Sequence, residues 1–136
     1  MTFRSLQQAL AQFAAEREWE QFHTPKNLAM ALAGESGELL EIFQWLTPEQ
    51  SAQVMQDADR AVQVREEMAD VLAYLLRLAD VLEVDLKQAL AEKIEKNRRK
   101  YPVDLARGRA EKYTQLGEDL RDADRDAAGP PVAEGR

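Results

Sequence analysis

The sequence predicts an all-α fold, and three observations support this prediction. Apolar residues recur at intervals close to 3.6 residues along most of the chain. The alternation of apolar and polar residues that is typical of β-strands is almost absent. Only two of the six glycines and two of the five prolines precede position 101, so signals that would break a helix are few. We therefore expect a helical bundle.

Four main helices are expected from this periodicity and from the residues that flank each segment. The first follows Ser5, which begins a capping-box pattern. The second follows Thr24 and has proline at its first position. The fourth follows Asp85 and ends before Tyr101, which precedes a proline. A second Thr-Pro pair begins a short additional helix. The expected ranges are 6–20, 24–45, 47–55 for the short helix, 60–82 and 86–100.

The length of 136 residues suits a single domain with one core. The segment 117–136 is small, polar and charged, and it cannot bury much apolar surface. We expect a folded domain over residues 1–116, followed by a disordered C-terminal tail over 117–136.

Charge and composition exclude several classes of function. The net charge of −7 argues against binding of duplex DNA by phosphate neutralisation, so no nucleic-acid partner is expected. No run of 18 apolar residues is present, so no membrane span is expected. Cysteine is absent, which excludes disulfides and thiolate metal sites and fits a cytoplasmic location. An acidic protein can still bind a phosphorylated small molecule if metal ions bridge the two.

Acidic residues interrupt the apolar face of the helix expected over 24–45. Glu35 falls inside the apolar stripe of that helix and Glu38 lies at its edge, three residues away. On a helix, side chains at this spacing are neighbours about 5–6 Å apart at Cβ. The stripe itself consists of Leu28, Leu32, Leu39, Ile42 and Phe43.

The helix expected over 60–82 repeats the pattern. Glu67, Asp70 and Tyr74 follow one flank of its apolar stripe. An uncompensated buried carboxylate costs several kcal/mol, and a hard divalent cation with oxygen ligands would relieve that cost. Zinc and di-iron sites are disfavoured because His23 is the only histidine, so Mg²⁺ or Mn²⁺ is expected. Alternatively, these acids are solvated or paired with bases. The expected stripe is Val64, Met68, Val71, Leu75, Leu78 and Leu82.

Basic and aromatic residues could complement the acids. Lys93 and Asn97 continue the inward stripe of the fourth helix, where they could hold phosphate oxygens. Cations near that helix end also stabilise the helix dipole, which accounts for some of the basic cluster. Trp19 and Trp45 could stack on a base, although aromatic residues at a helix junction are more commonly core residues.

Taken together, these residues resemble the MazG-like all-α nucleoside triphosphate pyrophosphohydrolases, and among them the dCTP pyrophosphatase branch. The family signature is Glu-x-x-Glu followed, after a spacer, by Glu-x-x-Asp. Here it reads Glu35-Ser-Gly-Glu38 and Glu67-Met-Ala-Asp70. The resemblance covers about residues 5–116. Its most specific stretches are 13–23 (FAAEREWEQFH), 34–39 (GESGEL), 43–45 (FQW), 97–102 (NRRKYP) and 112–114 (KYT).

The resemblance implies a four-helix bundle of MazG-like type, completed by assembly of identical chains into a dimer or tetramer. It implies that all four acids bind Mg²⁺, for which Mn²⁺ can substitute, and that Glu35 and Glu38 are catalytic. One departure concerns Leu10, which stands where some relatives carry a histidine that faces the substrate. The implied substrate-binding residues are Trp19, Glu20, Gln21, Phe22, His23, Trp45, Tyr74, Lys93, Asn97 and Tyr101.

The expected reaction is hydrolysis of a nucleoside triphosphate to the monophosphate and pyrophosphate. A glutamate would activate the water that attacks the α-phosphorus, and the metal ions would stabilise the charge on the triphosphate. The expected substrate is dCTP or a modified dCTP, removed from the nucleotide pool. Two alternatives stay open: a hydrolase that prefers dUTP or another nucleotide, and a non-catalytic helical oligomer that binds a partner.

Overall fold

The computed structural model describes residues 1–112, 114–115, 117–118 and 121, and it confirms the all-α prediction. No β-strand occurs in these residues. The chain divides into two compact units, Met1–Leu86 and Lys87–Arg136. Apart from residues 117–118 and 121, the tail predicted for 117–136 lies outside the described residues. The domain boundary at residue 116 stays a prediction.

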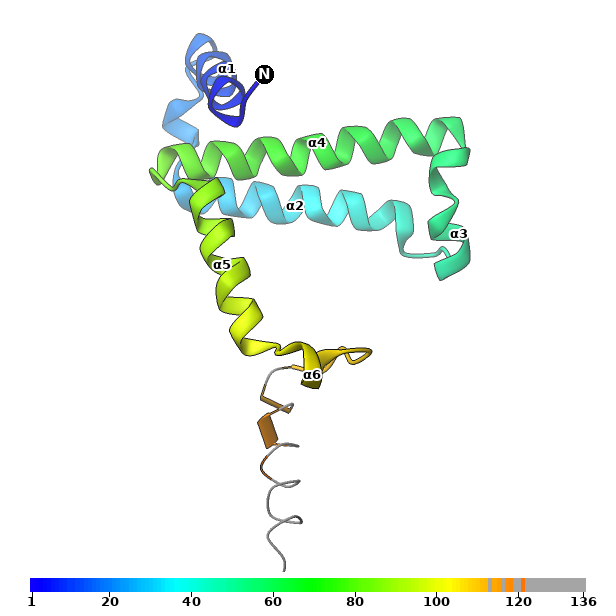
Figure 1. Ribbon diagram of the computed structural model, residues 1–136. Coiled ribbons are helices and arrows are strands. Elements are labelled where there is room, and N and C mark those ends of the chain that lie inside the picture. Colours follow the sequence, from blue (N-terminus) through cyan, green and yellow to red (C-terminus); the bar gives the residue numbers. More distant parts are fainter. Residues whose placement is uncertain (113, 116, 119–120, 122–136) are drawn as a thin grey trace, which may run out of the picture. The chain divides into compact units, whose positions relative to one another are not determined.

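The first unit is built around two long helices. In chain order, its elements are α1 (Phe3–Glu16), η1 (Glu20–Phe22), α2 (Pro25–Phe43), α3 (Pro48–Ala52), η2 (Val54–Gln56) and α4 (Ala58–Val81). Helices α2 and α4 lie side by side and antiparallel, and α3 lies in the connection between their adjacent ends (Figure 1). Helix α1 packs against α4. The α2–α4 pair is therefore the frame on which the other elements of this unit rest.

Each α-helix of the first unit begins at a residue whose side chain accepts a backbone hydrogen bond. Thr24 caps α2 as predicted, and its hydroxyl accepts a hydrogen bond from the Asn27 N–H at 3.2 Å. Helix α1 begins earlier than predicted, because Thr2 is its cap and Ser5 is the third residue of the helix. The two residues form a reciprocal capping box. Asp57 caps α4, and its carboxylate accepts a hydrogen bond from the Arg60 N–H at 2.9 Å.

Two helices of the first unit end in a Schellman motif with glutamate in the left-handed position. At the end of α1, Glu18 has φ 54° and the Trp19 N–H bonds to the Ala14 carbonyl. At the end of α4, Glu83 has φ 56° and the Val84 N–H bonds to the Ala79 carbonyl. The early turn after Glu16 explains why α1 does not continue to residue 20 as predicted.

The core of the first unit lies where α2 and α1 cover α4. Leu28 of α2 and Leu76 of α4 are its most buried large side chains, at 1% and 2% exposure. Three residues of the predicted stripe of α4, Met68, Leu75 and Leu82, are instead well exposed. Helices α1 and α2 cover only part of the apolar surface of α4, so within the first unit several of its apolar side chains are exposed.

The second unit begins with the predicted fourth helix. Helix α5 (Leu86–Lys100) has the expected bounds, and its last turn carries three basic residues. A short helix that we did not predict, α6 (Val103–Ala106), follows Pro102. None of the described helices has both the length and the apolar character that crossing a membrane requires.

We expect Glu83→Gly to stabilise the protein by about 0.5–1 kcal/mol, because glycine adopts a positive φ without the steric penalty of a Cβ atom. The free energy of unfolding in urea measures the effect. The control is Ala9→Gly at an exposed interior position of α1, which should destabilise by about 1 kcal/mol. A Glu83→Gly variant no more stable than the original would contradict the strain at this turn.

Candidate functional site

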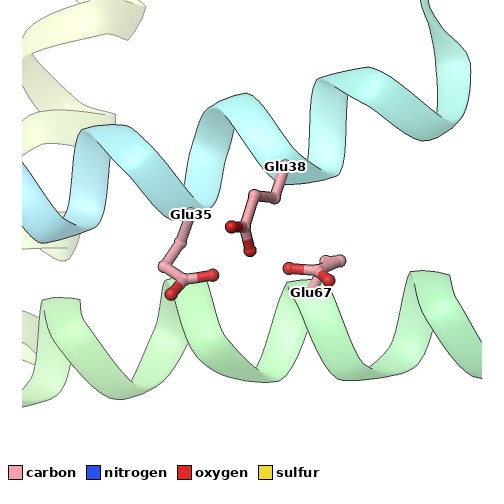
Figure 2. A group of neighbouring side chains, drawn as sticks. All are labelled: Glu35, Glu38 and Glu67. Carbon is pink, nitrogen blue, oxygen red and sulfur yellow. The ribbon is translucent and has the colours of Figure 1, made fainter.

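Three glutamates converge between α2 and α4. Glu35 and Glu38 project from α2 towards α4, which contributes Glu67 (Figure 2). One carboxylate oxygen from each of the three lies within 4.8 Å of the others. The spacing of three residues places Glu35 and Glu38 on the same side of α2, and the antiparallel pairing brings α4 opposite them. The sequence prediction that the two helices aim acids at one point is confirmed for these three residues.

The surroundings of these carboxylates favour a proton or a cation. One oxygen each of Glu35 and Glu67, the Oε2 atom, is buried without a hydrogen-bond partner. Burial, followed by the hydrogen bond and charge of Glu38 and then by the charges of Asp70 and Glu67, raises the pKa of Glu35 to about 7. The pKa of Glu67 is also raised, first by burial and then by the charge of Glu38. These carboxylates therefore lack internal compensation for their negative charge.

Asp70 belongs to the same acidic region but is not among the three that lie closest together. Its charge contributes to the raised pKa values of Glu35 and Glu67. Its side chain also lines the neighbouring pocket. Asp70 therefore lies between the three glutamates and that pocket.

The three glutamates fit a hard divalent cation. All of their ligand atoms are carboxylate oxygens, which Mg²⁺ and Mn²⁺ prefer. Two of the carboxylates have a buried oxygen with no partner in the protein, and a cation would provide that partner. Glu35, Glu38 and Glu67 would hold the ion.

A pocket of about 200 Å³ opens beside the acids, at the end of α4 that packs on α1. It brings together four residues predicted from the sequence: Trp19, His23, Asp70 and Tyr74. Trp19 is 44% exposed, and its ring stands edge-on to Phe13 at a centroid distance of 5.7 Å. Such a ring offers apolar surface to a flat ligand. The remaining lining residues are Leu10, Phe13, Ala73 and Arg77.

Sequence reasoning missed Arg77. This residue of α4 is only 9% exposed, and its Nε atom donates a hydrogen bond to Nδ1 of His23 at 3.2 Å. Its Nη1 atom forms an ion pair with Asp80 at 3.1 Å. The only signal in the sequence was a lone arginine within the apolar run 75–79 (LLRLA), and such a residue can equally be a surface cation.

Other predicted binding residues are not brought to this pocket. Glu20, Gln21 and Phe22 form η1 next to it but do not line it. Trp45 follows the far end of α2, is 86% exposed and lines a different hollow beside α3. Three further residues, all in the second unit, keep their roles as predictions: Lys93, Asn97 and Tyr101.

Comparisons with known proteins agree with this geometry. A model of the MazG-like family matches residues 32–116, a range that includes all four acids. The chain is 50% identical over 116 residues to dCTP pyrophosphatase 1 of Rattus norvegicus. It is 49% identical to dCTP pyrophosphatase 1 of Homo sapiens. Each match covers 85% of this chain and 68% of the relative.

A solved structure is similar over most of its length. The crystal structure of a pyrophosphatase from Archaeoglobus fulgidus superposes with a TM-score of 0.68 at 46% sequence identity. The match covers 73% of this chain and 91% of that chain. Fold and sequence therefore identify the same group of proteins.

We expect Glu35→Gln to raise the melting temperature of the metal-free protein more at pH 8 than at pH 5. The folded pKa of about 7 lies above the ordinary value of 4.5, so the folded state binds more protons between these values. Stability is therefore lost as the pH rises from about 4.5 to about 7, and the glutamine variant escapes this loss. Melting curves in EDTA at both pH values measure it. Glu66→Gln, on the exposed side of α4, is the control, and an equal gain at both pH values would contradict the raised pKa.

Proposed function

Because this chain belongs to the MazG-like family, we propose that it hydrolyses dCTP or a modified dCTP to the monophosphate and pyrophosphate, with Mg²⁺ as cofactor. The chain is an enzyme, a nucleotide pyrophosphohydrolase, as its relatives at about 50% identity and its structural neighbour indicate. The choice of base, the metal and the assembly are the parts that we propose.

One observation carries the proposal of a metal-assisted reaction. Three glutamates bring their oxygens within 4.8 Å of one another, and two of them have a buried oxygen without a partner. A cation bound there would neutralise the triphosphate and stabilise the charge that develops on it during hydrolysis; Mn²⁺ could substitute. Mg²⁺ fits this all-oxygen ligand set, and Asp70 completes the four acids of the family signature.

Glu35 and Glu38 are the proposed catalytic residues. Both project from α2 into the acidic cluster, where a carboxylate can accept a proton from water. We assign to one of these glutamates the role of general base, which takes a proton from the water that attacks the α-phosphorus. Attack there expels pyrophosphate and leaves the nucleoside monophosphate.

The pocket beside the acids is the proposed place for the base and sugar. Trp19 offers a partly exposed ring for stacking, and His23 and Tyr74 offer polar groups close to it. Neighbouring η1 would shape the entrance with Glu20, Gln21 and Phe22. In the second unit, Lys93, Asn97 and Tyr101 are the proposed contacts to phosphate and sugar.

We further propose that the active enzyme is a homo-oligomer, a dimer or a tetramer. Trp19 precedes α2 and Trp45 follows it, and a helix of 19 residues is about 28 Å long. One chain cannot enclose a single base with both rings, so the partner subunit would contribute the second tryptophan. Exposed apolar residues of α2 and α4 support such an interface: Met30, Leu40, Val62, Met68, Leu72 and Leu75. We place the enzyme in the cytoplasm, where nucleotide pools and reduced conditions fit a chain without cysteine.

In a panel of nucleoside triphosphates we expect dCTP to be the best substrate with Mg²⁺, yielding dCMP and pyrophosphate in equal amounts. EDTA should abolish the activity, and Mn²⁺ should restore it. Chromatography of the nucleotide products and a pyrophosphate assay provide the measurement. Release of dCDP and phosphate, or a clear preference for dUTP or a purine nucleotide, would overturn the corresponding part of the proposal.

The same panel should show that Glu67→Gln lowers kcat about 100-fold or more, because it removes a charge that the cation needs. Glu66→Gln is the matched control, one residue away on α4 and exposed, and should keep the activity of the original protein. Equal activity of both variants would remove Glu67 from the metal site.

Light scattering of the purified protein should give a molar mass of two or four chains. We expect this association because it would bury the exposed apolar side chains of α4. Met68→Lys places a charge among these side chains and should shift the mass towards that of one chain. Lys26→Glu, at an exposed position near the start of α2, is the control. A single-chain mass for the original protein would contradict the oligomer.

A further inference from the structure

A buried arginine contacts the only histidine of the chain. Arg77 lies on α4 with 9% exposure, and its Nε atom donates to Nδ1 of His23 at 3.2 Å. The guanidinium group is held from its other side by Asp80, whose carboxylate lies 3.1 Å from Nη1. The contacts with His23 and Asp80 therefore fix the orientation of the Arg77 guanidinium group.

The chemistry of the two groups determines where the histidine proton lies. Every nitrogen of the guanidinium is a donor, and arginine stays protonated at all physiological pH values. The Nδ1 atom of His23 must therefore accept the hydrogen bond and carries no proton. An imidazolium would direct its own N–H against that of Arg77. The neutral ring has its proton on Nε2, which makes Nε2 a hydrogen-bond donor.

We propose that Arg77 is a positioning residue that holds His23 as an uncharged imidazole with its proton on Nε2, and that this N–H donates to an uncharged oxygen of the nucleoside part of the substrate. The second half rests on the proposed function, because it requires a nucleotide in the pocket that both residues line. Burial and the charge of Arg77 lower the pKa of His23, which agrees with a neutral ring.

The surroundings favour the nucleoside over the phosphates as the recipient. His23 shares its pocket with Leu10, Phe13 and Trp19, which suit a flat ring. A neutral donor offers no net charge to a phosphate, and two of the five N–H groups of Arg77 already donate to His23 and Asp80. The competing interpretation is that Arg77 itself binds phosphate.

The presence of a single histidine makes the ring directly observable. In protein labelled with ¹⁵N-histidine, long-range ¹H–¹⁵N correlation spectra distinguish the protonated ring nitrogen from the unprotonated one. At pH 7, without nucleotide, we expect a protonated Nε2 and an unprotonated Nδ1. A proton on Nδ1, or a fully protonated ring, would overturn the proposal. This measurement needs no turnover, so it stands even if the proposed substrate is wrong.

Substitution of Arg77 tests the positioning role. Arg77→Met retains the apolar stem of the side chain and removes the donor, so the ring should lose its single tautomer and show exchange between both. The control is Arg65→Met, an exposed arginine on the same helix, which should leave the spectrum unchanged. A single Nε2-protonated form that persists in a folded Arg77→Met protein would refute the role of Arg77.

Kinetics separate the two recipients of the hydrogen bond. In Arg77→Met we expect the KM for dCTP to rise about 3- to 10-fold with a smaller change in kcat, the effect of weakening one neutral hydrogen bond. Competitive inhibition by inorganic pyrophosphate should stay within about twofold of the original. If pyrophosphate inhibition weakens as much as dCTP binding, Arg77 contacts phosphate and the nucleoside assignment fails. If the original protein does not hydrolyse dCTP at all, that result would instead count against the proposed function.

Discussion

Negative charge is concentrated between two packed helices, and the rest of the first unit is organised around that concentration. Glu35 and Glu38 on α2 oppose Glu67 on α4, with unpartnered oxygens in the interior. Left to itself, such a cluster would drive the helices apart or take up protons. The apolar contacts of Leu28 and Leu76 hold the pair together despite it. The protein maintains an unfavourable arrangement of negative charge that a bound divalent cation would make favourable.

The acidic residues of the site lie on regular helices, whereas two of its aromatic residues, Trp19 and His23, lie in a turn. The acids stand in the middle of the two longest helices, where backbone hydrogen bonds fix their directions. The aromatic wall comes from the turn between α1 and α2, in which Glu18 adopts a left-handed backbone and directs the chain towards Trp19. Arg77 joins the two regions, because it is anchored in α4 and reaches His23 at the end of that turn.

How much of this the sequence could predict depends on how local each cause is. Thr24 starts α2 through a contact within its own turn, so its role was predictable. Glu35 was found because it interrupts an apolar stripe, and Glu67 because it follows the flank of another stripe with a second acid three residues on. Arg77 was missed because its partner lies 54 residues away. The exposure of Met68 was mispredicted because periodicity identifies an apolar face without showing which neighbour covers it.

The placement of the acids within regular helix has an evolutionary consequence. One residue inserted between Glu35 and Glu38 would rotate their side chains by a further 100° or so about the helix axis, which no neighbouring adjustment could repair. The turn over residues 17–24 is not subject to that restriction, since a change in its length leaves the register of α2 against α4 untouched. Insertions and deletions should therefore accumulate at the rim of the pocket proposed for the base and stay out of the acidic centre, so that selectivity diverges while the hydrolytic chemistry is inherited unchanged.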